Sequence, residues 1–424
     1  MKNTYGWIGA MPMHWQTSRI GHLYTERKEK VSDRDFAPLS VTMKGILPQL
    51  STAAKTDAHD DRKLVRVGDF AINSRSDRRG SCGISPYDGS VSLINTVLIP
   101  RGEMHPRYYD WLFHSTMFSD EFYKWGHGIV DDLWTTNWQD MKRISVPVPP
   151  FAEQRRIADF LDRRCAEIDG VIEATKKTIE EYKALKQSII TEAVTGQCAI
   201  GNVQGSMGGK RRMKDSGIEW IGEIPEEWEC KPIKYVAKFQ PACDTSKLND
   251  ESETTYIPME CLKNGYYVKN TALFGALSSS LTPFEEGDIA MAKVTPCFEN
   301  GNIAIMNNLA SEFGMGSSEL FVYRPFAANA RYILYWLQND LFKQAACATM
   351  TGTGGLKRVS PYFAKNSCIP VPSSVEQREI TEYLDEKCAE IDRLIAIKQQ
   401  FLAELETYKK SVIYEYVTGK REVI

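Results

Sequence analysis

Residues 153–197 read EQRRIADFLDRRCAEIDGVIEATKKTIEEYKALKQSIITEAVTGQ, and residues 376–420 read EQREITEYLDEKCAEIDRLIAIKQQFLAELETYKKSVIYEYVTGK. Twenty of the 45 aligned positions are identical, without a gap, where unrelated segments of ordinary composition would share roughly 3. The chain is therefore a tandem duplication in which each copy ends with this segment. A protein built twice is better matched to a ligand with two separated sites than to a single catalytic pocket.

The duplication extends beyond these segments. Pro147-Val148-Pro149 recurs as Pro370-Val371-Pro372, and Trp7-Ile8-Gly9 recurs as Trp220-Ile221-Gly222. Pro12 and Trp15 also recur, as Pro225 and Trp228. The offset between the copies grows from 213 at their start to 223 at their end, so the second copy carries about ten additional residues, since 223 − 213 = 10.

Both repeated segments carry the end signals of a long helix. Ser373 and Glu376 fit a capping box, and Pro149-Pro150 precedes the equivalent position in the first copy. Gly196 and Gly419 stand where a helix favours a left-handed residue at its C-terminus. Between these limits lie about 43 residues, or roughly 64 Å of helix.

Apolar residues follow a seven-residue repeat in both helices, which is typical of a coiled coil. In the first helix they are Ile157, Leu161, Ile168, Val171, Tyr182, Leu185 and Ile189. In the second they are Ile380, Leu384, Ile391, Leu394, Phe401, Leu405, Tyr408 and Val412. We expect the two helices to pack antiparallel against each other and to hold the two globular parts at the ends of a rigid spacer.

The rest of each copy is predicted to be an α+β domain. Gly68-Asp69 and Gly287-Asp288 each precede an alternating apolar strand, and helices are expected over 107–119 and 330–346. The fold class is therefore α+β, with two tandem-repeated domains separated by two long antiparallel coiled-coil helices. We expect a first domain over 1–150, a first spacer helix over 151–197, a linker over 198–215, a second domain over 216–372 and a second spacer helix over 373–420.

The composition is that of an ordinary globular protein, with 42% hydrophobic and 25% charged residues. No stretch has the apolar length of a membrane span or signal peptide, so we expect a cytoplasmic protein. The ten cysteines are scattered without a C-x-x-C pair, and Cys165 and Cys388 occupy equivalent helical positions that favour buried thiols. A net charge of −3 does not favour nucleic acid, so any DNA-binding surface must be locally positive.

The sequence offers no catalytic or metal-binding motif that we can identify. All six histidines lie in the first copy, whereas a duplicated enzyme using histidine would keep one in both. Met207-Gly208-Gly209-Lys210 lacks the Ser/Thr and glycine positions of a phosphate-binding loop. Pro149-Pro150-Phe151 resembles part of the adenine methyltransferase tetrapeptide, but Val148 replaces the required Asp or Asn. We therefore predict no catalytic residue, no metal and no cofactor.

Polar loops in both copies carry side chains that can contact DNA. Arginine forks pair with guanine edges and Asn or Gln amides with adenine edges, while lysines and glycine-flanked backbone favour phosphate. The framing strands agree between the copies while the loops differ, as expected if each loop recognises different bases. Ordinary surface turns are the alternative for each residue. The candidate DNA-binding residues are Asn73, Ser74, Arg75, Arg78, Arg79, Trp134, Thr135, Lys293, Thr295, Asn300, Thr353, Lys357 and Arg358.

This combination resembles the DNA specificity subunits of type I restriction–modification systems. The matching features are a P-V-P-x-x-x-E-Q-R-x-I entry to a long helix and a W-I-G-x-x-P-x-x-W start, each present twice, with a Gly-Asp strand between them. The likeness covers nearly the whole chain. It implies two target recognition domains, each reading one part of a bipartite DNA site, with the helices fixing the gap.

The resemblance further implies that the helices dock two methyltransferase (modification) subunits, that restriction/translocase subunits join the complex, and that this chain itself is not an enzyme. By the same resemblance, Glu153, Gln154 and Arg155, with Glu376, Gln377 and Arg378, mark the domain–helix junctions and are candidates for partner docking. Near the positive end of each helix, the glutamate carboxylate is expected to complete the cap. Two alternatives stay open: a self-contained DNA methyltransferase or nuclease, and a coiled-coil scaffold that binds protein only.

Overall fold

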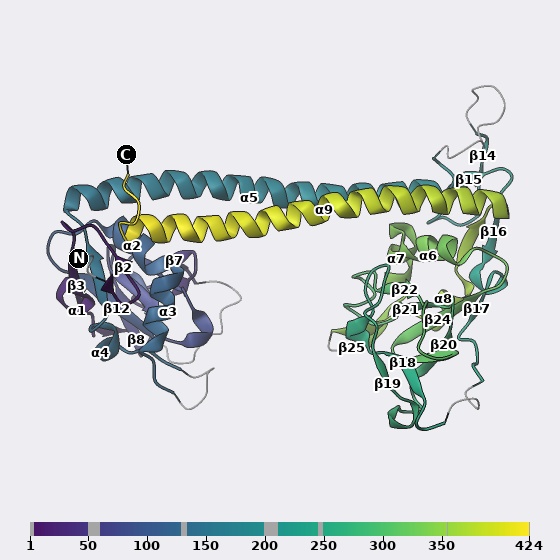
Figure 1. Cartoon of the computed structure of the whole chain (residues 1–424), viewed down its shortest axis with the longest axis horizontal. Helices are drawn as coiled ribbons and strands as arrows, with labels where there is room; N and C mark the ends of the chain where they lie inside the picture. The colour runs from purple at the N-terminus through teal and green to yellow at the C-terminus, as the bar shows by residue number, and fades with distance from the viewer. Residues whose placement is uncertain are drawn as a thin grey trace. The chain divides into compact units, whose positions relative to one another are not determined.

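The computed structural model describes residues 4–49, 60–128, 134–198, 211–244, 249–353 and 355–423. The chain forms two compact units. Unit 1 comprises Met1–Lys177 and Lys398–Ile424, and unit 2 comprises Thr178–Ile397. Each unit therefore contains one α+β part together with a portion of both long helices (Figure 1). Most of the predicted linker, residues 199–210, lies outside the described residues.

The main sheet of unit 1 is antiparallel and has the strand order β10-β9-β12-β4. Its strands are β4 (Tyr24–Glu26), β9 (Phe70–Asn73), β10 (Cys82–Ile84) and β12 (Asn95–Pro100). The smaller sheets contain β1 (Thr4–Tyr5), β2 (Gly9–Ala10), β3 (Gln16–Arg19), β5 (Lys30–Val31), β6 (Leu39–Thr42), β7 (Gly45–Pro48), β8 (Arg62–Val65), β11 (Gly89–Ser92) and β13 (Ser145–Val148). The short helices are α1 (Ile20–Leu23), α2 (Pro106–His114), α3 (Thr116–Lys124), α4 (Trp138–Met141) and the 3-10 turn η1 (Ser76–Arg78).

Unit 2 repeats this sheet as β22-β21-β24-β17 and adds a second sheet, β19-β18-β23-β20. The strands of these two sheets are β17 (Ala237–Phe239), β18 (Glu253–Ile257), β19 (Thr271–Leu273), β20 (Thr282–Glu285), β21 (Ile289–Ala292), β22 (Ile303–Ile305), β23 (Phe313–Gly316) and β24 (Leu320–Pro325). The paired ribbons are β14 (Met213–Asp215) with β15 (Glu223–Pro225), β16 (Glu229–Pro232) with β27 (Cys368–Val371), and β25 (Thr351–Thr353) with β26 (Leu356–Arg358). The helices are α6 (Ala330–Gln338), α7 (Asp340–Cys347), α8 (Pro361–Asn366) and the 3-10 turns η4 (Ile233–Tyr235), η6 (Met259–Cys261) and η7 (Phe274–Ala276).

The predicted α+β class is confirmed, but each predicted domain helix is two helices. Ser115 separates α2 from α3, and its Oγ accepts a hydrogen bond from the Phe118 N–H at 3.3 Å. Asn339 separates α6 from α7, and its Oδ1 accepts from the Phe342 N–H at 3.0 Å. Both residues are strong N-caps, so a new helix begins where the apolar pattern alone continues.

The aspartate of each Gly-Asp turn makes a buried ion pair. Asp69 accepts two hydrogen bonds from Arg27, at 2.7 and 3.0 Å, and one from the Arg66 N–H at 2.8 Å. Asp288 accepts two from Arg324, at 2.8 and 2.9 Å. The bonds to Asp288 raise the pKa of Arg324, which stays charged. Because both aspartates are almost fully buried, the motif fixes the turn before the strand and is not a ligand site.

The two long helices are α5 (Phe151–Val194) and α9 (Ser374–Val417), each of 44 residues. Gly196 and Gly419 follow them with φ of 73° and 69°, which confirms the predicted left-handed C-terminal glycines. No helix among the described residues is long and apolar enough to cross a membrane.

Within each unit the long helices run antiparallel, as predicted. In unit 1, Lys409 of α9 forms an ion pair with Asp169 of α5 at 2.7 Å. In unit 2, Lys186 of α5 forms an ion pair with Asp392 of α9 at 2.6 Å. The two pairs are copies of each other, since 169 + 223 = 392 and 186 + 223 = 409. The duplication therefore preserves the register of the helix pair.

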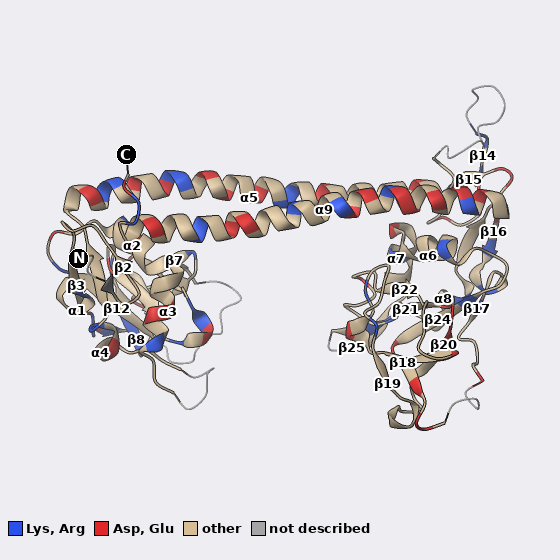
Figure 2. Cartoon of the chain, viewed as in Figure 1, with Lys and Arg blue, Asp and Glu red and all other residues tan. Residues whose placement is uncertain are grey.

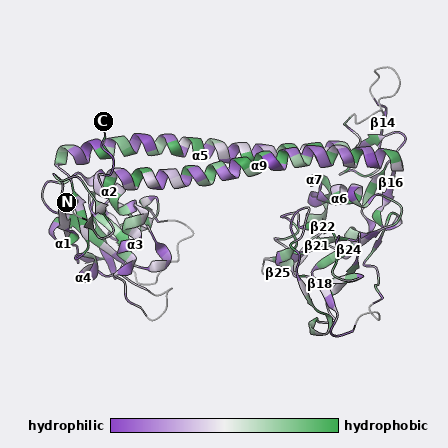
Figure 3. Ribbon diagram, viewed as in Figure 1, coloured by the Kyte–Doolittle hydropathy of each residue, from purple (hydrophilic) through white to green (hydrophobic). Residues whose placement is uncertain are grey.

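The predicted apolar positions along the middle of this helix pair were partly wrong. The side chains at five of them are exposed: Val171, Leu185, Leu394, Phe401 and Tyr408. In α5 the buried positions in this region are Ile168, which was predicted, and Ile172, Thr175 and Ile179, which were not; the four keep the 4-3-4 spacing of a coiled coil. Figure 3 shows hydrophobic and hydrophilic residues alternating along both helices. Apolar side chains on the long helices therefore include exposed ones as well as buried ones.

Each long helix ends in the core of the unit opposite to the one in which it starts. Ile190, Ala193 and Val194 of α5 belong to the core of unit 2. Val412, Ile413 and Val417 of α9 belong to the core of unit 1. Buried tyrosine hydroxyls donate to the last carbonyls: Tyr332 to Val194 O at 3.2 Å and Tyr108 to Val417 O at 2.8 Å.

A buried glutamine fixes the start of each long helix. The Gln154 amide accepts from the His105 N–H and donates to Pro149 O, both at 2.9 Å. The Gln377 amide accepts from the Asn329 N–H at 2.8 Å and donates to Pro372 O at 2.9 Å. Each glutamine therefore ties the strand before the helix to the start of a domain helix.

Replacing Asp69 with Ala should destabilise unit 1 by about 3–5 kcal/mol, because the largely buried Arg27 would lose its two hydrogen bonds and keep the longer 3.9 Å contact with Glu29. The matched control is Asp120→Ala, which removes an exposed ion pair with Arg79 and should cost less than about 1 kcal/mol. Calorimetric unfolding of the full chain measures both. Equal losses for the two variants would contradict a structural role for the buried pair.

Replacing Gln377 with Met keeps the side-chain volume but leaves the Asn329 N–H and the Pro372 carbonyl without their partner. We expect a loss of at least about 2 kcal/mol in the unfolding free energy of unit 2. Arg378→Ala, at the next, exposed position, should change stability by less than about 0.5 kcal/mol. Urea denaturation compares the two variants. A Gln377→Met variant as stable as the wild type would show that the hydrogen bonds of Gln377 do not stabilise the start of α9.

Candidate nucleic-acid interface

In unit 1 the structure brings the two predicted polar loops together. The Ser76 N–H donates to Trp134 O and the Thr136 N–H donates to Ser74 O, both at 2.9 Å. Arg75 and Thr135 form an isolated antiparallel bridge between these two bonds. The loop after β9 and the segment before α4 therefore form one continuous surface.

Unit 2 uses the same backbone frame. The Thr295 N–H donates to Lys357 O and the Val359 N–H donates to Lys293 O, again both at 2.9 Å. Val294 and Arg358 form the corresponding bridge. The loop after β21 thus packs against strand β26 of the β25–β26 hairpin, as the loop after β9 packs in unit 1.

The equivalent frame positions carry different side chains. The first loops correspond at an offset of 219, which aligns Arg75 with Val294. The later segments correspond at 223, which aligns Thr135 with Arg358. Trp134 is likewise aligned with Lys357. One conserved frame therefore presents two chemically distinct surfaces.

The predicted residues divide into those that shape the loops and those that face solvent. Ser74 is 4% exposed and bonds to the Thr96 hydroxyl at 3.2 Å, while Thr295 is 8% exposed and donates to Gly355 O at 2.7 Å. Asn73 is half-buried, and its Oδ1 accepts from the Arg75 N–H at 3.1 Å. The exposed predicted residues are Arg78, Arg79, Asn300, Thr353, Lys357 and Arg358, with Arg75, Trp134, Thr135 and Lys293 half-buried.

Carboxylates neighbour most of the arginines on these surfaces. Asp77 lies 3.3 Å from Arg75, and Asp120 lies 3.3 Å from Arg79. In unit 2, Glu319 accepts two hydrogen bonds from Arg358, which lower the pKa of the glutamate. Figure 2 shows basic and acidic residues interspersed over both units. Charges of both signs thus lie close together on these surfaces.

A cavity of about 610 Å³ adjoins the unit 1 loop. Ser76, Arg79 and Trp134 line it on the loop side. The Arg79 guanidinium lies 5.2 Å from the centre of the Tyr123 ring, which also lines the cavity. Arg79 and Trp134 were predicted from the sequence, whereas Ser76 and Tyr123 were not.

The glutamate of each Glu-Gln-Arg motif bonds to a tryptophan. The Trp15 indole donates to Glu153 at 2.9 Å, and the Trp228 indole donates to Glu376 at 2.9 Å. The Ser373 half of the predicted capping box forms, with the Glu376 N–H donating to Ser373 Oγ at 3.3 Å. The carboxylates of Glu153 and Glu376 were expected to complete the helix caps. In the structure they bond to Trp15 and Trp228 and so join the start of each domain to the long helix that follows it.

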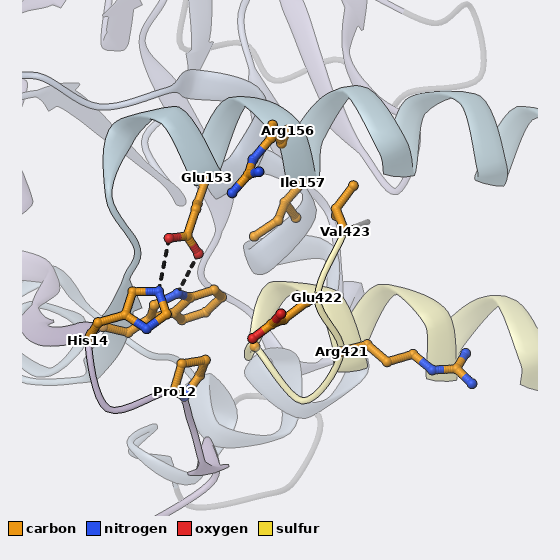
Figure 4. A pocket seen from close by; sticks show the side chains of 10 residues that line it. Pro12, His14, Glu153, Arg156, Ile157, Arg421, Glu422 and Val423 are labelled. Carbon is orange, nitrogen blue, oxygen red and sulfur yellow. Dashed lines mark hydrogen bonds and ion pairs between the residues drawn. The ribbon is translucent and has the colours of Figure 1, made fainter.

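The two junctions differ in the nitrogen-bearing side chain beside the glutamate. His14 contacts Glu153 at 2.9 Å and lines a cavity of about 170 Å³ at the start of α5 (Figure 4). In unit 2, Arg211 takes this place, 2.7 Å from Glu376. Arg211 therefore has a structural role, although the sequence placed it in a solvated linker.

Arg155 and Arg378 complete the motifs and are exposed on the first turns of α5 and α9. They are available to a partner, whereas Gln154 and Gln377 are buried. Among the described residues, no cluster of three or more His, Cys, Asp or Glu side chains could hold a metal ion. Glu319 and Asp120, which pair with interface arginines, were missed because nothing local in the sequence marks a pairing that spans about 40 residues.

Residues 225–407 match the family model of the type I restriction modification DNA specificity domain. The specificity subunit of type I restriction enzyme EcoAI from Escherichia coli is 34% identical over 195 residues, 45% of this chain and 32% of that protein. The chain thus spans about a third of the length of this relative. The specificity subunit of type I restriction enzyme MjaVIII from Methanocaldococcus jannaschii is 24% identical over 97% of this chain and 94% of that protein.

A solved structure from work on the assembly and conformational transition of a type I R-M system has the same fold, with a TM-score of 0.72. It covers 97% of this chain and 99% of that one, at 15% sequence identity. The repeated junctions, the paired long helices and these likenesses agree. Over nearly its whole length, the chain is similar to the specificity subunits of type I restriction–modification systems.

Proposed function

We propose that this chain is a non-catalytic DNA-recognition subunit in which each unit reads one part of a bipartite double-stranded site. The observation that carries this proposal is the shared backbone frame with different side chains in the two units. A frame kept constant while its outward side chains change is what two different base sequences require. Arg78 and Arg79 in unit 1 and Lys357 in unit 2 supply exposed positive charge for the DNA backbone.

The candidate DNA-binding set follows from this frame. Arg75, Arg78, Arg79, Trp134 and Thr135 contribute the surface of unit 1. The surface of unit 2 comprises Lys293, Asn300, Thr353, Lys357 and Arg358. Asn73, Ser74 and Thr295 stabilise the loops through hydrogen bonds below this surface.

The long helices set the gap between the two half-sites in this proposal. Both are 44 residues long, and their antiparallel pairing within each unit is fixed by ion pairs in a constant register. A paired helix resists bending better than a flexible linker of the same length. The number of residues in the helices therefore determines the number of untouched base pairs.

Exposed apolar side chains on the helices support docking of two methyltransferase subunits. Val171 and Leu394 are equivalent positions in the duplication, as are Leu185 and Tyr408, and all four are exposed. Two similar surfaces fit two copies of one partner. The exposed Arg155 and Arg378 extend them. Restriction/translocase subunits would join this complex in the cytoplasm, and the cofactors of the reaction would bind to the partners.

Genome-wide methylation mapping, in cells with and without this chain, tests the proposal directly. We expect adenine methylation at a split motif only when the chain is present together with its methyltransferase subunits. Methylation by the purified chain with S-adenosylmethionine alone, or cleavage with magnesium alone, would instead support a self-contained enzyme. A partner-bound complex without sequence preference in a footprint would support a protein-only scaffold.

Replacing both Arg78 and Arg79 with Ala should weaken recognition of the half-site read by unit 1 by about 1–3 kcal/mol for each lost base contact. The half-site read by unit 2 should keep its base preferences. Competition binding with DNA changed in one half-site at a time measures this. A loss of affinity that is equal for all of these DNAs, with discrimination kept in both half-sites, would show that these arginines contact phosphate only.

Inserting one heptad into α5 after Thr175 and one into the facing turn of α9 near Ala403 should lengthen the preferred gap. Seven residues preserve the coiled-coil spacing and add about 10.5 Å of helix. At about 3.4 Å per base pair this corresponds to about three base pairs. Methylation mapping should show both half-sites unchanged, and an unchanged gap would remove the spacer role of the helices.

A further inference from the structure

Arg358 is held differently from the other arginines of the interface. Its Nε donates to Glu319 Oε2 at 2.9 Å and its Nη2 donates to Glu319 Oε1 at 2.8 Å. This bidentate pair uses the N–H of Nε and one N–H of Nη2, which leaves the two N–H groups of Nη1 and the second N–H of Nη2. No described residue bonds to Nη1, and the side chain is 47% exposed. At the end of the guanidinium, one N–H of Nη1 and the second N–H of Nη2 are parallel; we call this pair the free edge.

Glu319 is itself fixed in the turn before β24. Its N–H donates to Ser317 Oγ at 3.2 Å, and its carbonyl accepts from the Lys293 N–H at 3.0 Å. The Lys293 ammonium donates to Ser318 O at 2.6 Å and so ties the same turn. The hydrogen bond from Arg358 holds the pKa of Glu319 below its usual value, so the carboxylate is charged at neutral pH. Arg358 is therefore oriented before any ligand arrives.

The arginines of unit 1 lack this arrangement. Arg79 contacts Asp120 at 3.3 Å through Nη1 and lies over the Tyr123 ring at 5.2 Å, and Arg75 contacts Asp77 at 3.3 Å through Nε. Arg78 lies 3.8 Å from Asp77 and is 68% exposed. Among the described residues, none of these three arginines forms a bidentate pair with a carboxylate, so their guanidinium groups are less strictly oriented than that of Arg358. The position equivalent to Arg358 is Thr135, which has no guanidinium.

We propose that Arg358 reads a guanine in the half-site of unit 2, with Glu319 as its positioning residue. The free edge would donate two parallel hydrogen bonds to O6 and N7 of guanine in the major groove. A phosphate is disfavoured at the same edge, because the charged Glu319 carboxylate repels a second anion on the far side of the guanidinium. Pre-orientation also removes part of the entropy cost of ordering a long side chain. This inference rests on the DNA-reading function proposed above.

The test uses the full chain assembled with its methyltransferase subunits and a plasmid library randomised in both half-sites. For Arg358→Ala we expect discrimination at one G·C position of the unit 2 half-site to fall by about 10- to 100-fold. Neighbouring positions and the unit 1 half-site should keep their preferences. Thr135→Ala, the matched change in unit 1, should leave that G·C position unaffected.

Glu319→Gln tests the positioning role, since it keeps the shape of the side chain but removes its charge. We expect a smaller loss of discrimination confined to the same G·C position, with an unchanged unfolding midpoint of the full chain. Full discrimination in this variant would overturn the role of Glu319.

A uniform loss of affinity over all sequences in Arg358→Ala would overturn the guanine contact. A slope of log K against log salt reduced by about 1 would then identify a phosphate contact instead. These outcomes are distinct from failure of the proposed function, in which the unaltered complex would itself show no base preference.

Discussion

The last turn of each long helix must bury its apolar residues and satisfy its free carbonyls, and it does so in the unit where the other helix begins. A helix end leaves backbone carbonyls without intrahelical partners. Tyr108 and Tyr332 supply buried hydroxyls for Val417 and Val194. Each α+β part therefore has a complete core only when two helices, from distant parts of the sequence, meet on it. The antiparallel pairing of the long helices within each unit depends on this packing.

The duplication preserves buried polar contacts and changes exposed ones. Asp69 and Asp288 each pair with an arginine, although Arg27 follows β4 and Arg324 lies in β24, and Gln154 and Gln377 keep equivalent backbone partners. These groups cannot change singly, because a lost partner would leave a buried charge or amide unsatisfied. Solvent-facing positions carry no such penalty. This difference explains how one frame can hold a threonine in unit 1 and an arginine in unit 2.

Much of the architecture was predictable because its signals are local or repeated. The tandem helices, their C-terminal glycines and the α+β class followed from spacing and duplication. The helix breaks at Ser115 and Asn339 were missed because the apolar pattern continues through the caps. Val171 and Phe401 were assigned to the helix contact because periodicity alone does not distinguish a buried apolar side chain from an exposed one. The pairing of Arg358 with Glu319 joins segments that only the tertiary fold brings together.

The crossed helix ends have a consequence for synthesis on the ribosome. Every segment of unit 2 precedes residue 398, whereas unit 1 also needs residues 398–424. Translation at about 5–20 residues per second separates residue 177 from residue 398 by roughly 10–45 s. Synthesis therefore begins with unit 1 but supplies the last residues of that unit only after unit 2 is complete. Until the last turns of α9 emerge from the ribosome, the apolar surface of unit 1 on which they pack stays exposed to chaperones, or to the equivalent helix of another nascent chain.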